Sequence, residues 1–223
     1  MPLAGHHVAF VGGPGVRYEE LPPPPVLAPW VAVCWRISTA DDFELRIPPD
    51  GCMDIIGGDI VGSFSTYGLA QLPAGSVSSG IRFHPGGFSA LFGVPASELV
   101  DRRAPIRDVV PRFRSLSHLA ADALRPDPVV RTVWRASDVR AVAREVGYSE
   151  RQLRRRVLAA TGHPPKRLMR IARMQRLLRD GPGETWARAA VEHGYFDESH
   201  MVSDVRSLVG ATPHALWASV FSK

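Results

Sequence analysis

The sequence contains no asparagine and only two lysines, Lys166 and Lys223, among its 27 basic residues. Because asparagine and lysine codons are rich in adenine, this bias indicates a GC-rich bacterial genome. Arginine therefore carries almost all of the positive charge, and asparagine amides are excluded from any polar recognition.

Cysteines and long apolar runs are also scarce. The two cysteines, Cys34 and Cys52, cannot form a disulfide framework. No apolar run approaches the roughly 18–20 residues that a membrane-spanning helix needs. The opening MPLAGHHVAF lacks the basic and apolar regions of a signal peptide. These absences predict a cytoplasmic protein without a membrane partner.

Charge is distributed unevenly along the 223 residues. From residue 129 onward, 17 Lys and Arg stand against 9 Asp and Glu, a net charge of +8. Residues 1–128 hold 10 basic and 13 acidic residues, a net charge of −3. An acidic front half and a basic back half favour two modules with different partners. The basic module suits nucleic acid or an anionic membrane.

The front half has the short alternating segments and frequent turns of a β-rich fold. Apolar side chains alternate along residues 31–37, which predicts a strand, and Gly57–Gly58 predicts a hairpin. The other predicted elements are strands at 43–47, 63–67 and 76–83, a turn at 48–51, two short helices within 84–100, and a helix from Ser115 to Arg125. Such a series predicts a small barrel or sandwich.

The back half contains two copies of one pattern, in which an alanine precedes a Gly-Tyr pair by four residues. A second glycine follows 15 or 16 residues after the first, with proline three residues beyond it. The alanine lets two helices cross closely, and the first glycine supplies a left-handed turn between them. Ser149 and Asp197 suit the N-cap of the second helix in each copy. The pattern therefore predicts two helix-turn-helix units.

The second helix of the first unit lies within GYSERQLRRRV, residues 147–157. With Leu153 and Val157 turned inward, a period of 100° per residue places three arginines on the opposite side, as a helix entering the major groove requires. The predicted base contacts are Arg151, Arg154 and Arg155, with Gln152 beside them. Arg156 lies on the flank, where it suits a phosphate or an internal carboxylate.

The second unit and the helix between the units are predicted in the same way. With Met201 and Val205 inward, the outward side of the second unit is nearly neutral. The predicted base contacts there are Glu198, Ser199, His200, Val202 and Ser203. In residues 164–181 the predicted core positions are Leu168, Ile171, Ala172, Gln175 and Leu178. The predicted phosphate contacts are Arg156, Lys166, Arg167, Arg170, Arg173 and Arg206, with internal salt bridges as the alternative for one or two on the joining helix.

The back half resembles the DNA-binding domain of the AraC/XylS family of bacterial transcription regulators. The resemblance covers about residues 128–219 and rests on VAREVGYSERQLRRRV, R-x-x-R-M-Q-R-L-L and GYFDESHMVSDVRSLVGATPHAL. It implies two helix-turn-helix units set in successive major-groove turns on one face of DNA. The sequence departs from the family at Ser203, where an arginine is common, and at Val157 and Val205, where an aromatic is usual.

The front half is similar to an uncharacterised, cupin-like N-terminal domain found on some AraC-type regulators, through PPDGCMDII and GIRFHPGGFSALFGVPASELVDRR. The similarity implies a sensing or dimerising role and names no ligand. The predicted pocket residues are Trp30, Trp35, Phe43, Phe64, Tyr67 and Phe83, for which a place in the core is the alternative. Asp50 and Asp54 suit either a turn or a polar anchor.

Metal chemistry finds little support in the sequence. A cupin oxygenase needs a His-x-His cluster with further ligands, whereas His6 and His7 adjoin one another and His84 stands alone. We therefore predict no metal, no cofactor and no enzymatic activity.

The predicted fold is α+β with two domains, divided at the proline-rich RPDP of residues 125–128. Residues 1–126 form a β-rich effector-sensing or dimerisation domain that ends in a linker helix. Residues 127–223 form an all-α domain whose two helix-turn-helix motifs are joined by a long helix.

The predicted function is sequence-specific binding of double-stranded DNA by a transcription regulator. A small molecule or homodimerisation through the front domain would control it, and RNA polymerase would be a partner if it activates. Without asparagine, arginines would contact guanine O6 and N7. The alternatives are a ligand-independent architectural DNA-binding protein and a metal-dependent cupin-type enzyme fused to a DNA-binding domain. A membrane-surface role for the basic half is disfavoured, because an amphipathic helix on a membrane would not be interrupted by the glycines and prolines found here.

Overall fold

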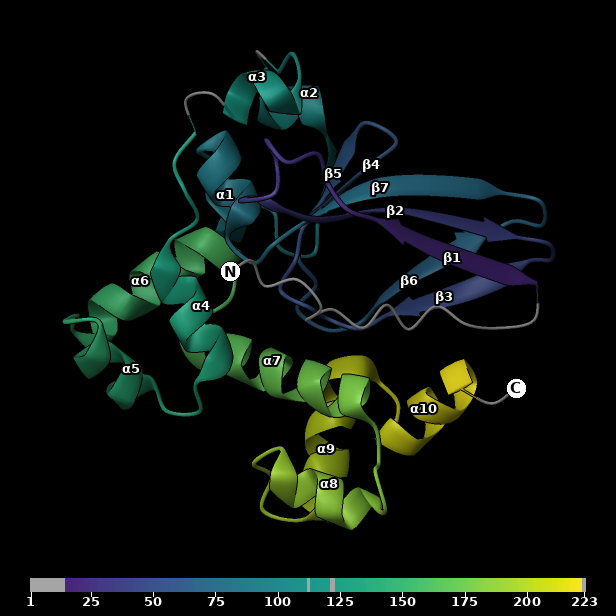
Figure 1. The fold of residues 1–223 in the computed structure, drawn as a ribbon, viewed down its shortest axis with the longest axis vertical. Helices are drawn as coiled ribbons and strands as arrows, with labels where there is room; N and C mark the ends of the chain where they lie inside the picture. Colours follow the sequence, from purple (N-terminus) through teal and green to yellow (C-terminus); the bar gives the residue numbers. More distant parts are fainter. Residues whose placement is uncertain (1–14, 112, 121–122, 222–223) are drawn as a thin grey trace.

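Strands are confined to the first half of the chain, and the second half is helical (Figure 1). The computed structural model describes residues 15–111, 113–120 and 123–221. Figure 1 shows the strands on one side of the molecule and the long helices beside and below them. This architecture confirms the predicted α+β fold class.

The β-rich part consists of two antiparallel sheets. The strands are β1 (Val16–Leu21), β2 (Val31–Thr39), β3 (Phe43–Ile47), β4 (Asp54–Ile56), β5 (Asp59–Val61), β6 (Gly68–Leu72), β7 (Val77–Phe83) and β8 (Arg103–Pro105). Six of them pair in the order β1-β2-β7-β4-β5-β8, and β3 pairs with β6 separately. The predicted hairpin joins β4 to β5, where Ile56 pairs with Asp59.

Short helices close one end of the larger sheet (Figure 1). They are α1 (Gly87–Phe92), the 3-10 helix η1 (Ala96–Glu98), α2 (Ile106–Val109) and α3 (Leu116–Ala120). The core beneath them is aromatic, since the ring centres of Phe83 and Phe88 lie 5.7 Å apart and those of Phe88 and Phe92 lie 4.5 Å apart. Trp30 and Phe83 are 2% and 0% exposed and belong to this core.

The helix predicted from Ser115 to Arg125 is wrong at its C-terminal end. The described part of α3 is Leu116–Ala120, residues 121 and 122 lie outside the described residues, and residues 123–127 are neither helix nor strand. The indole Nε1 of Trp30 donates to the carbonyl of Leu124 at 2.7 Å, and the Arg125 guanidinium lies 5.1 Å from the Trp30 ring centre. These contacts fix the segment, and the following proline disfavours helical backbone at Arg125.

The strand predicted at residues 63–67 is a loop instead. The Ser63 hydroxyl donates to the carbonyl of Thr161 at 3.1 Å, and the backbone N–H of Ser65 donates to Asp101 Oδ1 at 2.7 Å. The loop is therefore held by a distant helix end and by a neighbouring turn rather than by a strand.

The helical part is built around one long central helix, α7 (Figure 1). The helices are α4 (Pro128–Arg135), α5 (Val139–Glu145), α6 (Glu150–Thr161), α7 (Pro165–Asp180), α8 (Trp186–Glu192), α9 (Glu198–Val209) and α10 (Pro213–Phe221). The five predicted core positions of α7 are all buried, which confirms the predicted stripe. Helices α5 with α6 and α8 with α9 form the two predicted helix-turn-helix units.

The β-rich part packs against the C-terminal end of α6. The last carbonyl groups of a helix have no partner within that helix. Here the Ser63 and Ser89 hydroxyls donate to the carbonyls of Thr161 and Ala159, at 3.1 and 3.3 Å. Gly162 then ends the helix in a left-handed conformation, with φ of +79°. We call this set of bonds the α6 contact.

An equivalent contact lies at the end of α9. Arg46 Nη1 donates to the carbonyl of Val209 at 2.9 Å, and its guanidinium lies 4.3 Å from the centre of the Tyr67 ring. A Cβ at Gly210, which follows the helix, would approach Tyr67 and Arg46 too closely. We call this the α9 contact. The β-rich part therefore holds the second helix of both units at the same end.

Two glycines provide a matched test of the α6 contact. Gly162 and Gly147 both adopt left-handed backbone, with φ of +79° and +69°, so alanine strains both alike. A Cβ at residue 162 would overlap Val100, whereas a Cβ at residue 147 has nothing within 4 Å. We expect Gly162→Ala to lower the free energy of unfolding by about 1–3 kcal/mol more than Gly147→Ala, because overpacking adds to the strain. Urea denaturation measures both; equal losses would contradict close packing at this end of α6.

His163 lies in the same interface and predicts a pH dependence. It is 1% exposed, and burial, with the nearby Arg167 guanidinium, lowers its pKa from 6.5 to about 4. Between these values the unfolded chain binds more protons than the folded chain, so the free energy of unfolding decreases as the pH is lowered. Lowering the pH from 7 to 4 should therefore remove about 3 kcal/mol of unfolding free energy from the wild type relative to His163→Gln. Denaturation at both pH values measures this, and a constant difference would refute a neutral, buried imidazole.

Candidate nucleic-acid interface

The first unit places its second helix through two predicted local signals. Gly147 makes the turn after α5 with φ of +69°. Ser149 caps α6, since its hydroxyl accepts from the Gln152 N–H at 3.2 Å while Gln152 Oε1 accepts from the Ser149 N–H at 2.9 Å. This reciprocal capping box fixes the start of the helix. It also engages the amide oxygen of Gln152, one of the predicted base contacts.

The outward side of α6 carries free positive charge. Leu153 and Val157 are fully buried, as predicted. The exposed side chains on the other side are Arg151, Arg154 and Arg155. Within the described part of the chain, none of these three has a carboxylate within ion-pair distance. Their guanidinium groups are therefore available to an anion from outside the protein.

Arg156 is engaged within the chain. Its Nη2 lies 2.7 Å from Asp127 Oδ2, and its guanidinium lies 5.0 Å from the centre of the Tyr148 ring. The bond to Asp127 raises the pKa of Arg156 above its ordinary value. Asp127 is also the N-cap of α4, so Arg156 ties α6 to the N-terminal end of α4. The sequence left two partners open for Arg156, a phosphate or an internal carboxylate. In the structure Arg156 binds an internal carboxylate.

The second unit presents a weaker surface. Met201 and Val205 are fully buried, as predicted, and Asp197 caps α9 by accepting from the His200 N–H at 2.7 Å. The exposed members of the predicted set are Ser199, His200, Ser203 and Arg206, with Glu198 and Val202 half-buried. Glu198 Oε1 lies 3.3 Å from His214 Nε2. One arginine thus faces outward here, against three on α6.

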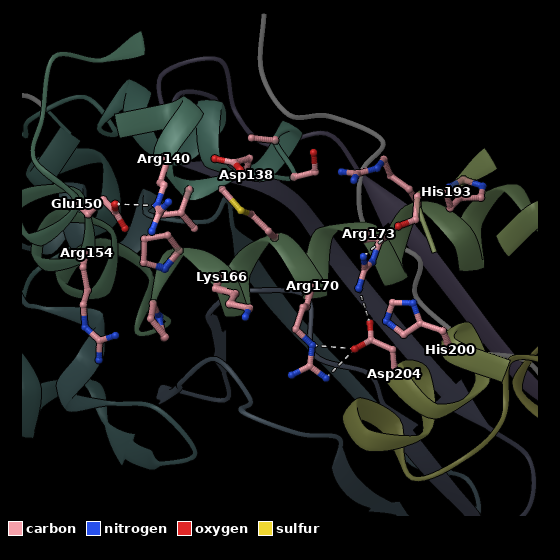
Figure 2. A pocket seen from close by; sticks show the side chains of 18 of the residues that line it. Asp138, Arg140, Glu150, Arg154, Lys166, Arg170, Arg173, His193, His200 and Asp204 are labelled. Atoms are coloured by element: carbon pink, nitrogen blue, oxygen red, sulfur yellow. Dashed lines mark hydrogen bonds and ion pairs between the residues drawn. The ribbon is translucent and has the colours of Figure 1, made fainter. Parts of the chain in front are cut away.

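The arginines of α7 have different partners within the protein, and Figure 2 shows two of them, Arg170 and Arg173, at Asp204. Lys166 is exposed, but the Arg167 guanidinium donates to the carbonyl of Ser65 in the β-rich part. Arg170 and Arg173 bond to the two carboxylate oxygens of Asp204 in α9, at 2.8 and 3.0 Å. These two were predicted as phosphate contacts with salt bridges as the alternative, and their carboxylate partner was missed.

A basic groove runs along α7 between the two units (Figure 2). The positively charged side chains that line it are Arg140, Arg151, Arg154, Lys166, Arg170, Arg173 and Arg176, and the negatively charged ones are Asp138, Glu150 and Asp204. Figure 2 shows Lys166 between Arg154 at one end and His200 at the other. The excess of positive charge suits a polyanion that passes from one unit to the other.

A separate cavity of about 250 Å³ lies between the two sheets. Of the six predicted pocket residues, Trp35 and Phe64 line it. Trp30 and Phe83 lie in the core instead, Tyr67 lies in the α9 contact, and Phe43 is half-buried in β3 without lining this cavity. The structure therefore brings together two of the predicted pocket residues.

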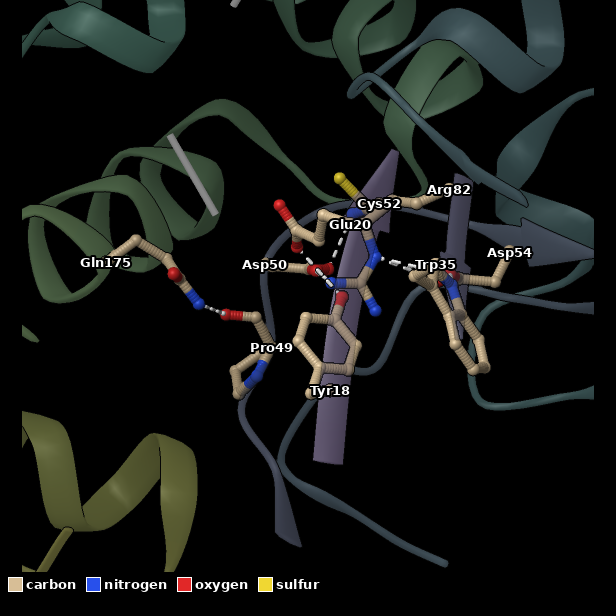
Figure 3. A network of polar contacts seen from close by, with 9 residues as sticks. All are labelled: Tyr18, Glu20, Trp35, Pro49, Asp50, Cys52, Asp54, Arg82 and Gln175. Carbon is tan, nitrogen blue, oxygen red and sulfur yellow. Dashed lines mark hydrogen bonds and ion pairs between the residues drawn. The ribbon is translucent and has the colours of Figure 1, made fainter. Parts of the chain in front are cut away.

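Polar residues at one end of this cavity form a buried ionic network (Figure 3). Arg82 lies 3.4 Å from Asp50 and 3.2 Å from Asp54, and the indole of Trp35 donates to Asp54 at 2.7 Å. Burial raises the pKa of Asp54, and the two carboxylates raise that of Arg82 despite its own burial. Asp50 also accepts from the Cys52 N–H at 2.9 Å. Asp50 thus serves both as a turn residue and as a polar anchor, the two roles that the sequence left open. The sequence analysis missed the pairing of Arg82 with the two aspartates, because only the fold brings these residues together.

Other chemistry is little supported by the described residues. Within residues 15–111, 113–120 and 123–221, no three His, Cys, Asp or Glu side chains gather as a metal site would require. His6 and His7 lie outside the described residues. Among the described helices, none is long and apolar enough to cross a membrane.

Two family models match the chain. A domain of unknown function matches residues 19–105, and a helix-turn-helix domain of the AraC type matches residues 142–218. The second match confirms the resemblance of the back half, and the first confirms that the front half is similar to an uncharacterised domain. No curated protein matches the sequence.

Two solved structures of one protein match this chain. The crystal structure of ToxT from Vibrio cholerae O395 matches with 9% identity and a TM-score of 0.45, over 95% of this chain and 100% of that chain. The unsaturated fatty acid bound wild-type ToxT from Vibrio cholerae strain SCE256 matches with 9% identity and a TM-score of 0.42, over 94% of this chain and 95% of that chain.

Asp204 links the second unit to α7 through two arginines. Removing it leaves Arg170 and Arg173 without their shared carboxylate and loosens α9. We expect Asp204→Ala to lower the free energy of unfolding by about 2 kcal/mol, the range of hydrogen bonds to charged groups. Asp197→Ala, which removes only the cap of the same helix, should cost about 1 kcal/mol. Denaturation of the two variants measures the order, and a larger loss for Asp197→Ala would contradict it.

Proposed function

We propose that this chain, which carries an AraC-type helix-turn-helix domain behind a domain of unknown function, is a transcription regulator that binds specific sequences in double-stranded DNA. The observation that supports this best is the set of three outward arginines on α6. They stand on the second helix of a capped helix-turn-helix unit, opposite its fully buried positions. A helix that enters the major groove presents its side chains in this way.

The two units would act together through α7. We call α6 and α9 the reading helices, each of which is the second helix of its unit. The basic groove along α7 would face the phosphates between the two contacted stretches of major groove, with Lys166 among its exposed cations. Each phosphate neutralised should add about 0.9 to the slope of log affinity against log salt. Because Arg156, Arg167, Arg170 and Arg173 have partners within the protein, we infer a smaller slope than the number of arginines suggests.

Guanine is the base that this surface favours. Arginine binds guanine O6 and N7 with two parallel hydrogen bonds, and the sequence holds no asparagine for adenine. The neutral side of α9 would add short contacts, with the Ser199 and Ser203 hydroxyls reaching polar base edges and Val202 a thymine methyl. We infer a site with guanines under α6 and a more mixed sequence under α9.

The β-rich part would serve as the regulatory domain. It holds both reading helices at their C-terminal ends, so a ligand or a second copy bound to it could change their relative position. We propose control by a small molecule or by homodimerisation, with RNA polymerase as a partner if binding activates, and a cytoplasmic location. The cavity between the sheets supports the ligand alternative. We also propose that the chain has no enzymatic activity.

Selection from random DNA duplexes, followed by binding titrations at several salt concentrations, tests the proposal. A guanine-containing site should emerge. Arg151→Ala, Arg154→Ala and Arg155→Ala should each lose preference at a single position, by roughly 1–3 kcal/mol for each arginine that contacts a guanine.

Arg156→Ala is the matched control, because this arginine lies on the same helix but is paired with Asp127. It should leave the selected sequence unchanged. Binding without sequence preference would support the architectural alternative. A uniform loss in all three arginine variants, with a flatter salt slope, would show phosphate contacts and contradict base reading by α6.

A further inference from the structure

One arginine of the cavity wall also holds a reading helix. Arg46 lies in β3 and lines the cavity between the sheets. Its Nη1 donates to the carbonyl of Val209, the last residue of α9, at 2.9 Å, and its guanidinium lies over the Tyr67 ring. A single side chain therefore reaches both the interior of the β-rich part and the end of the second unit.

Arg46 differs from the other charged residues of the cavity wall in its partners. Arg82 is paired with Asp50 and Asp54, and Arg103 lies 2.8 Å from Asp59. Arg46 has no carboxylate within ion-pair distance among the residues that the structure describes, and bonds to a neutral carbonyl instead. The wall thus holds one positive charge without a counter-charge.

The rest of the wall is suited to an apolar body. Its main apolar and aromatic residues are Trp35, Leu45, Ile47, Ile56, Phe64 and Leu72. The volume of about 250 Å³ corresponds to roughly eight water molecules, so that only a small molecule fits. Charge and shape together call for a compact apolar group with one negative end.

The two aspartates of the wall do not call for a cation. Both bond to Arg82, and Asp54 also accepts from the Trp35 indole while Asp50 accepts from the Cys52 N–H. Their oxygens are therefore occupied by donors of the protein. A cationic ligand would have to displace the buried guanidinium of Arg82 from these carboxylates. This costs far more than binding to a carboxylate that has no partner.

The geometry points to a binding site for a small organic anion in this cavity, whose negative group is received by Arg46 in competition with the carbonyl of Val209. A carboxylate offers the Arg46 guanidinium an ionised acceptor and two parallel N–H···O bonds, whereas the carbonyl of Val209 is neutral and accepts one such bond. The ligand would therefore draw Arg46 away from α9 and release the end of that helix. The α6 contact, made by serine hydroxyls, would stay in place. This inference rests on the proposed function, since it makes the ligand the regulator of the second unit.

Calorimetry on the full chain without DNA tests the site. The probes are phenylacetate, phenylethanol and phenylethylamine, which share an aromatic body and differ in charge. We expect phenylacetate to bind at least about tenfold more tightly than the other two, because it alone forms the charged bond. Arg46→Gln should abolish this preference. Arg36→Gln, at an exposed position of β2 that does not line the cavity, should preserve it.

Three results would overturn the site: equal affinities for the three probes, an unchanged preference in Arg46→Gln, or no binding of phenylacetate at millimolar concentration. Because no DNA is present, these results do not depend on whether the protein binds DNA. Failure of the site and failure of the proposed function are therefore distinguishable.

Hydrogen exchange tests the competition for Arg46. Saturation with phenylacetate should speed amide exchange in residues 205–213, at the end of α9, and Arg46→Gln should show the faster rate without ligand. Residues 155–165, at the end of α6, should exchange at the same rate throughout. Slower or unchanged exchange in residues 205–213 on binding would overturn the competition.

Discussion

Two helices that end against another domain impose the main constraint on this molecule. The last carbonyl groups of a helix need donors from outside the helix, and burial removes water as a donor. The β-rich part supplies these donors from Ser63 and Ser89 for α6 and from Arg46 for α9. Between the two ends runs α7, whose 16 residues span about 24 Å. The spacing of the two units therefore depends on one rigid helix and on two anchored ends.

Arginines in the helical part divide into those with and those without an internal carboxylate. Asp127 forms an ion pair with Arg156, and Asp204 forms ion pairs with both Arg170 and Arg173. These aspartates come from other helices, so that their bonds stabilise the arrangement of helices rather than any one helix. The arginines left on the outward side of α6 have no such partner in the described structure. An internal network and a binding surface are thus built from the same residue type, and the presence or absence of an internal carboxylate partner separates them.

The sequence predicts well what depends on neighbouring residues. The capping of α6 by Ser149 and the inward placement of Leu153 and Val157 follow from local spacing, and the structure confirms both. Features that depend on contacts across the fold were missed or misplaced. The helix expected to reach Arg125 stops early because Trp30 binds the segment, and residues 63–67 form a loop because they meet α6. Aromatic residues that line the cavity could not be distinguished from those in the core, because both alternate along the strands in the same way. Only the positions of the two sheets show which side chains face the cavity.

The two units are unequal in charge and in how they are held. Under the proposed function, affinity for DNA comes mainly from charge, so α6, with three outward arginines, would supply most of it. α9 has one outward arginine and would contribute discrimination rather than affinity. The β-rich part holds α6 through neutral hydroxyls but holds α9 through Arg46, which also faces a cavity. A change at that one guanidinium would alter the weaker unit and leave the stronger one attached. Such a regulator would stay bound to DNA through α6 while the ligand changes the contact that α9 makes.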